Sequence, residues 1–209
     1  YDIGHVFSTG GGGIASLRSP CGTRKAQGVT GQSTPVGDPF DVDYVAHEMG
    51  HQYGGNHTFN GTTGSCSGNL ASQSSYEPGS ATTIMGYAGI CSGQNIQNNS
   101  DAFFHTYSFD EIIAFSVNGS GNSCASVTNT GNNQPNVSAG TGGYFIPKST
   151  PFELIGTAND PNGDSLTYSW EQFDLGDRGH PNSPIGNAPL FRSFEPKTIP
   201  SRTFPQISD

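Results

Sequence analysis

The segment HEMGHQYGGNH, residues 47–57, concentrates side chains that can do metal chemistry. It holds three of the six histidines of the chain, His47, His51 and His57, with Glu48 directly after the first. Residues four apart on a helix point to the same side, so His47 and His51 can bind one metal ion. A glycine turn can return His57 to the same ion. Three imidazole ligands that leave one open position are typical of catalytic zinc.

A helix has to position the first two histidines, and residues 37–55 carry the pattern of one. Pro39 lies just before the helix, Asp41 and Asp43 supply capping and N-terminal charge, and the glycine pair at 54–55 ends it. Four apolar residues recur at three- and four-residue spacing, which places them on one face of the helix: Val42, Val45, Ala46 and Met49.

Patterns in the rest of the chain indicate further elements and a domain boundary. Short strands separated by glycines are expected before residue 34, and a second helix over residues 108–119, with Ser108 and Glu111 at capping-box spacing. The polar stretch NTGNNQPN at 129–136 reads as a linker. We therefore predict an α+β domain at residues 1–130 and a second module at 131–209.

The second module alternates strand-like pieces with turn signals. The pieces are YFIP, FELIGTA and LTYSWEQF, at 144–147, 152–158 and 166–173. This pattern predicts an incomplete all-β module of the sandwich type, and the region resembles the bacterial Ig-like or PKD-like modules appended to secreted enzymes. Asp160, Asn162 and Asp164 alternate as calcium ligands do, but the loop is too short for an EF-hand. A tight turn is the favoured interpretation, and a calcium site is the alternative.

Composition excludes several classes of partner. The formal net charge is −9 and only eight residues are lysine or arginine, which argues against nucleic acid or an anionic membrane surface as partner. No apolar run approaches the ~20 residues of a membrane helix. The 30 glycines and 14 prolines indicate a loop-rich globular chain.

The four cysteines indicate an exported protein. They are even in number and widely spaced, without a CxxC pair: Cys21, Cys66, Cys91 and Cys124. Two disulfides are favoured over metal ligands, and disulfides form in oxidising compartments. From the residues alone, three pairings are open.

Two motifs also carry a family resemblance. HEMGHQYGGNH resembles the extended zinc signature of the metzincin clan of metallopeptidases, and TIMGYAG at 83–89 resembles the Met-turn of that clan. The stretches DIGHVFSTGGGGIA and CGTRKAQGV are similar to bacterial members of the reprolysin/adamalysin-like group. The resemblance covers about the first 130 residues. It implies the C-terminal part of a metzincin-type catalytic domain, with a mixed sheet edge, an active-site helix and a C-terminal helix.

The resemblance also implies an activity and roles for single residues. The protein would be a secreted zinc endopeptidase acting on proteins or peptides. Glu48 would take a proton from the attacking water and deliver it to the leaving amine. Met85 would form a hydrophobic floor beneath the zinc, and the Tyr87 hydroxyl would assist at the oxyanion. Without the resemblance, Met85 would be interpreted as a residue that fills the hydrophobic core, and Tyr87 as an ordinary half-buried aromatic.

Further expectations follow from the same resemblance. Cys21 would pair with Cys124 and Cys66 with Cys91, and an extended substrate would pair with the strand at residues 13–18. Thr58 departs from the family pattern, because reprolysins typically have aspartate after the third histidine. Such domains also have elements ahead of the region that starts at Tyr1, so an N-terminal polypeptide or an upstream propeptide is an expected partner. The rival function is a catalytically silent, zinc-stabilised adhesion or binding module, against which Glu48 argues.

Overall fold

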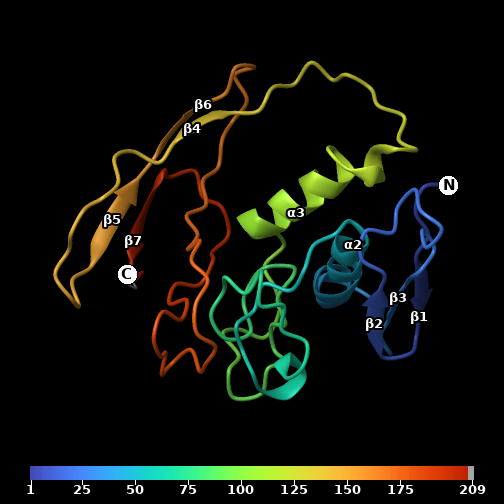
Figure 1. Ribbon diagram of the computed structural model, residues 1–209, viewed down its shortest axis with the longest axis horizontal. Coiled ribbons are helices and arrows are strands. Elements are labelled where there is room, and N and C mark those ends of the chain that lie inside the picture. The colour runs from blue at the N-terminus through green and yellow to red at the C-terminus, as the bar shows by residue number, and fades with distance from the viewer. Residues whose placement is uncertain (207–209) are drawn as a thin grey trace. The chain divides into compact units, whose positions relative to one another are not determined.

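The computed structural model describes residues 1–206, which form two compact units (Figure 1). The first unit comprises Tyr1–Ser126 together with Glu171–Ser193, and the second comprises Val127–Trp170 and the residues from Phe194 onward. The architecture mixes α and β elements, with few helices and small sheets among the described residues. None of the helices in residues 1–206 combines the length and the apolar content needed to cross a bilayer.

A small mixed sheet opens the first unit. Strand β1 (Val6–Ser8) runs parallel to β3 (Gly28–Gly31), and β2 (Gly12–Ala15) runs antiparallel to β3 on its other side. The order β1-β3-β2 therefore places β2 at an edge of this sheet. The strand predicted at residues 13–18 corresponds to β2, which begins one residue earlier and ends at Ala15.

The predicted first helix is confirmed as a continuous helical segment with a π turn at its centre. It comprises α1 (Asp38–Phe40), the π-helical η1 (Asp41–Ala46) and α2 (His47–Gln52). Pro39 is tolerated in the first turn because no intrahelical acceptor exists for its missing N–H, and the early aspartates favour the helix N-terminus. Single π turns inside α-helices occur frequently at functional sites.

Buried polar contacts fix α2 against the sheet. Figure 1 shows α2 beside β2 and β3. The fully buried Gln52 accepts a 2.7 Å hydrogen bond from Nδ1 of His5, whose Nε2 lies 2.6 Å from Oγ1 of Thr30 in β3. His5 therefore links helix and sheet. The rotation of α2 about its own axis is fixed in this way, and with it the side toward which His47 and His51 point.

The second predicted helix forms as α3 (Thr106–Ser116), but its predicted start was wrong. The N-cap is His105, whose Nδ1 accepts a hydrogen bond from the Tyr107 N–H, and not Ser108. Glu111 does not close a capping box, because its carboxylate accepts hydrogen bonds from both the backbone and the side chain of Asn56, at 2.8 and 2.5 Å. It therefore ties α3 to the residue that precedes His57.

Loops with short 3₁₀ turns fill much of the remainder of the first unit. These turns are η2 (Gly64–Cys66) and η3 (Ser120–Asn122). Two disulfides close the loops, Cys21–Cys124 across 103 residues and Cys66–Cys91 across 25, the pairs that the resemblance implies. Cys66 and Cys91 belong to a buried cluster with Phe59, against which Tyr87 packs.

The second unit contains two antiparallel two-stranded ribbons. One joins β4 (Asn136–Ser138) to β6 (Thr157–Asn159), and the other joins β5 (Phe152–Ile155) to β7 (Ser201–Phe204). The stretch 152–158 is thus confirmed as strand. The strand predicted at 144–147 was wrong, since Phe145 there is fully exposed and no ladder includes these residues among those described. The domain boundary predicted at 130/131 stays a prediction.

Candidate metal centre

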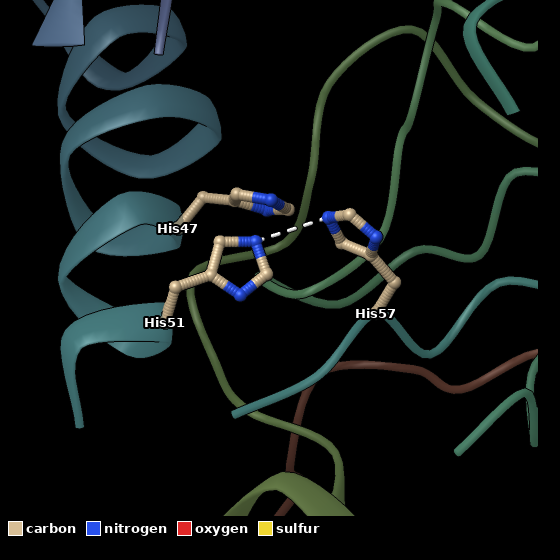
Figure 2. A group of neighbouring side chains, drawn as sticks. All are labelled: His47, His51 and His57. Atoms are coloured by element: carbon tan, nitrogen blue, oxygen red, sulfur yellow. Dashed lines mark hydrogen bonds between the residues drawn. The ribbon is translucent and has the colours of Figure 1, made fainter. Parts of the chain in front are cut away.

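Three histidines from two short segments converge in the first unit. His47 and His51 lie one turn apart on α2, and His57 follows from the loop after it (Figure 2). One ring nitrogen from each lies within 4.8 Å of the corresponding nitrogens of the other two, and Nε2 of His51 is 3.0 Å from Nε2 of His57. In the part of the chain that the structure describes, this is the one group of histidine, cysteine and acidic side chains close enough to share an ion.

A glycine allows the chain to return His57 to the helix. The backbone of Gly54 has φ +104°, a conformation that other residues rarely adopt. The N–H groups of Gly54 and Gly55 bond to the carbonyls of His51 and Gly50, at 2.9 Å each, and so satisfy the open end of α2. The chain reverses there, and His57 arrives six residues after His51 facing the same point.

Backbone carbonyls fix the orientation of all three imidazoles. Nδ1 of His47 donates to Ile84 O at 2.7 Å, Nδ1 of His51 to Gly55 O at 2.7 Å, and Nδ1 of His57 to Asn69 O at 2.6 Å. A neutral imidazole that donates from Nδ1 presents a lone pair at Nε2. The three Nε2 atoms are therefore free to serve as ligands, and the rings of His47 and His57 are held by carbonyls distant in the sequence.

Burial keeps these rings neutral. Burial lowers the pKa of His47 well below its usual value, and the neighbouring His51 and His57 add to the effect. The pKa of His51 is also lowered by burial, against the opposing bond to Gly55. For His57, burial and the nearby His51 bring the pKa to about 4. Neutral imidazoles are the form that binds a metal ion.

The donor set fits zinc. Two Nε2 lone pairs at 3.0 Å repel each other unless a proton or a cation lies between them. Oε2 of Glu48, also buried, has no hydrogen-bond partner among the described residues. Three neutral imidazoles beside such a carboxylate match the chemistry of a zinc site with an open position. The predicted ligands His47, His51 and His57 are thus brought together as a candidate zinc site.

Glu48 lies between α2 and the edge strand. A Cβ atom at Gly13 of β2 would collide with the Glu48 carboxylate, so glycine is required at this close approach. Burial raises the pKa of Glu48 to about 7. A carboxyl group with a pKa in this range is suited to proton transfer near neutral pH.

Met85 and Tyr87 approach the centre from a loop. Met85 is fully buried beneath α2, where a Cβ at Gly50 would lie 2.5 Å from its Sδ. The Tyr87 ring centroid is 4.6 Å from that of His57 and 5.5 Å from that of His47. Burial, and secondly the charge of Glu48, raise the pKa of Tyr87 to about 12, so its hydroxyl remains a proton donor. The catalytic and floor roles of these two residues stay predictions.

Glu77, which is fully buried behind the centre, was not predicted from the sequence. Its Oε2 accepts hydrogen bonds from the hydroxyls of Thr58 and Thr83, at 2.7 and 2.5 Å, and its Oε1 accepts from the N–H and hydroxyl of Thr82. Thr58 directly follows His57, and Thr83 precedes Ile84, whose carbonyl binds His47. No spacing rule links a lone glutamate in a loop to residues on both sides of it.

A cavity of about 560 Å³ opens along the centre. Gly13, His47, Glu48 and Tyr87 line it, and it continues past the preceding turn of the helical segment. It therefore lies between the edge strand and His47.

The residues predicted as an alternative calcium site form a turn in the second unit. Oδ1 of Asp160 accepts hydrogen bonds from the backbone N–H groups of Asn162 and Asp164, at 2.7 and 3.2 Å. Oδ1 of Asn162 accepts from Asn133. These bonds are those of a tight turn, and the calcium assignment stays a prediction.

Comparison with known families supports a peptidase over the N-terminal part of the chain. Residues 1–58 match the family model described as Metallo-peptidase family M12B Reprolysin-like. The match ends one residue after His57 and so includes β1 to β3, the helical segment and all three histidines. It covers less than half of the 209 residues. No curated protein and no solved structure matches the chain. Residues 1–58 are accordingly similar to M12B metallopeptidases.

Proposed function

We propose that the protein is a zinc-dependent endopeptidase. The observation that carries the proposal is the convergence of three neutral imidazoles, each fixed through Nδ1, beside the buried and unpartnered Oε2 of Glu48. The match of residues 1–58 to a metallopeptidase family supports it independently. His47, His51 and His57 would hold zinc through Nε2. When bound, zinc supplies Lewis-acid polarisation of a carbonyl and lowers the pKa of a water.

Glu48 moves the proton in this mechanism. Its carboxylate takes a proton from the water that attacks the scissile carbonyl, and then delivers that proton to the nitrogen of the leaving amine. The raised pKa of Glu48, about 7, suits both steps because the group can accept and release a proton near neutral pH. No covalent enzyme intermediate is required, because water is the nucleophile.

Strand β2 orients the substrate. It is an edge strand in the sheet, and Gly13 lies directly against Glu48. A peptide that adds to an edge strand is held by main-chain hydrogen bonds in an extended form. A peptide paired with β2 would therefore bring its backbone carbonyl past Glu48, within the cavity.

Tyr87 and Met85 complete the proposed centre. The Tyr87 hydroxyl, kept protonated by burial, donates a hydrogen bond to the oxygen on which negative charge develops. Met85 fills the space beneath α2 and keeps water from the rear of the site. Tyr87 is itself held by Phe59, with ring centroids 4.6 Å apart.

We also propose that the enzyme acts outside the cell. Two disulfides support this location, since such bonds persist in oxidising compartments. The region after residue 130 would be an Ig-like or PKD-like module that binds or spaces, and Asp160, Asn162 and Asp164 would be its calcium ligands. Calcium-dependent thermal stabilisation that disappears in Asp160→Asn would test the last assignment.

Peptidase activity is tested by cleavage of casein by the zinc-loaded protein. We expect turnover that a zinc chelator abolishes and that added zinc restores. Glu48→Gln should bind one equivalent of zinc and show no turnover, whereas Glu195→Gln, which changes an exposed glutamate in the second unit, should retain it. Zinc bound by the wild-type protein without cleavage would favour the silent binding module instead.

A further inference from the structure

The cavity extends from the candidate zinc ligand His47 to Asp43, another acidic residue of the helical segment. Asp43 lies in η1, four residues before His47, and so faces the same side of the helical segment. It lines the cavity together with a loop that includes Asn98 and Ser100. Asp43 lies about one helical turn before His47, so we expect the side chain of a substrate residue next to the scissile bond to reach it.

The Asp43 carboxylate is fixed in place. Its Oδ1 accepts a 2.6 Å hydrogen bond from the N–H of Ser100, so the helix and the opposite wall of the cavity meet at this residue. Asp43 is half-buried, and burial raises the pKa of its carboxyl group although the bond from Ser100 opposes the rise. A carboxylate that loses hydration in this way gains from a nearby cation.

No lysine or arginine side chain faces Asp43 among the described residues of the cavity. The ion pairs found within residues 1–206 do not involve Asp43. The one histidine among the described residues on the cavity wall, His47, is a candidate zinc ligand. Apart from Glu48 at the proposed zinc centre, Asp43 is the one acidic side chain among the described residues that line the cavity, and its carboxylate attracts a basic group and repels an acidic one.

The walls leave room for a side chain next to Asp43. Gly86, Ala88 and Gly89 follow Met85 along the cavity, and a Cβ at Gly89 would collide with the carbonyl of Asn98. Because these residues are small, the loops pack closely behind the cavity and their side chains do not fill it. A long, unbranched side chain with a terminal charge can extend over them toward Asp43.

We propose that Asp43 is a specificity-determining residue that selects substrates with lysine or arginine next to the scissile bond. The inference rests on the proposed peptidase function and names the substrate class of the same site. The main chain of the substrate pairs with β2, and one flanking side chain turns into the cavity, where its cation meets the Asp43 carboxylate.

The test compares cleavage preferences among three forms of the full chain loaded with zinc. The wild type, Asp43→Asn and Asp41→Asn each digest a mixed peptide library, and mass spectrometry identifies the bonds cut. Asp43→Asn keeps an acceptor for Ser100 N–H but removes the charge. Asp41→Asn is the matched control, because Asp41 is an exposed acid of the same helical segment that does not line the cavity.

We expect the wild type and Asp41→Asn to favour lysine or arginine over norleucine at one flanking position, on the order of tenfold in kcat/KM. Asp43→Asn should lose most of this preference. The proposal is overturned if the wild type favours apolar, amide or acidic residues there, or if Asp43→Asn keeps the basic preference.

A binding measurement separates this proposal from the proposed function. Zinc-loaded Glu48→Gln is titrated with fluorescent peptides that differ only by lysine or norleucine, with and without Asp43→Asn. If no form cleaves peptides but lysine still binds more tightly through Asp43, the peptidase function fails and the basic specificity stands. If cleavage and the binding preference are both absent, both proposals fail.

Discussion

The hydroxyl of Thr58 donates a 2.7 Å hydrogen bond to Oε2 of Glu77, within a fully buried cluster. Thr58 occupies the position after the third histidine, where the resemblance leads one to expect aspartate. The carboxylate that Thr58 contacts comes from a residue 19 positions later in the chain. Through Thr83 and Thr82 the same carboxylate also holds the loop that leads to Met85.

Loss of this carboxylate should destabilise the protein. Glu77→Gln replaces one acceptor oxygen with a donor, so either the hydroxyls of Thr58 and Thr83 or the N–H and hydroxyl of Thr82 lose their buried acceptor. An unsatisfied buried group costs roughly 1–3 kcal/mol, and we expect the free energy of unfolding to fall by about 2 kcal/mol. Urea denaturation measures this change. Glu195→Gln, at an exposed site, should alter the free energy of unfolding little. If Glu77→Gln also left this free energy unchanged, the role given to the buried cluster would be contradicted.

Removal of one imidazole should weaken metal binding more than it disturbs the fold. His51→Ala leaves two ligands from three, so zinc affinity should fall at least tenfold, and bound zinc after dialysis should drop well below one equivalent. Metal analysis measures the bound zinc, and circular dichroism checks that the variant keeps its fold. His180→Ala changes an exposed histidine outside the centre and should keep full zinc content. Equal zinc content in the two variants would rule out the site.

Acid should destabilise the zinc-free protein through His57. Its pKa is about 4 in the folded chain against 6.5 ordinarily, so the unfolded state binds more protons between these values. The contribution of His57 to stability is therefore present above pH 6.5 and is lost as the pH falls toward 4. His57→Asn cannot take this proton. Thermal unfolding of both proteins should show the wild type losing stability relative to His57→Asn across that window.

The contribution of Glu48 to stability should have the opposite pH dependence. Its pKa is raised from 4.5 to about 7 by burial, so the folded state holds the proton more tightly than the unfolded state. Stability from this group is full below pH 4.5 and is lost as the pH rises through 7. We expect zinc-free Glu48→Gln to melt at a higher temperature than the wild type at pH 8, and the difference to vanish at pH 4.5. A difference independent of pH would show that the carboxyl group is not desolvated.

Local patterns succeeded where neighbours in the chain are neighbours in space. The helical segment Asp38–Gln52 follows from Pro39, the early aspartates and the closing glycines, because each acts within one turn of its own position. The start of α3 was wrong for the complementary reason. Ser108 and Glu111 have the spacing of a capping box, but Asn56, 55 residues earlier, takes the Glu111 carboxylate.

By itself, the sequence determined which residues form the candidate zinc site. His47 and His51 are joined by one helical turn and His57 by a glycine reversal, so their convergence is a property of eleven consecutive residues. Tertiary structure alone decided how the site is supported and what it faces. The carbonyls of Ile84 and Asn69, the Glu77 cluster, the approach of Gly13 to Glu48 and the bond from Ser100 to Asp43 all join distant segments. Such contacts form when buried polar groups pair during packing, so they cannot be predicted from residue spacing along the chain.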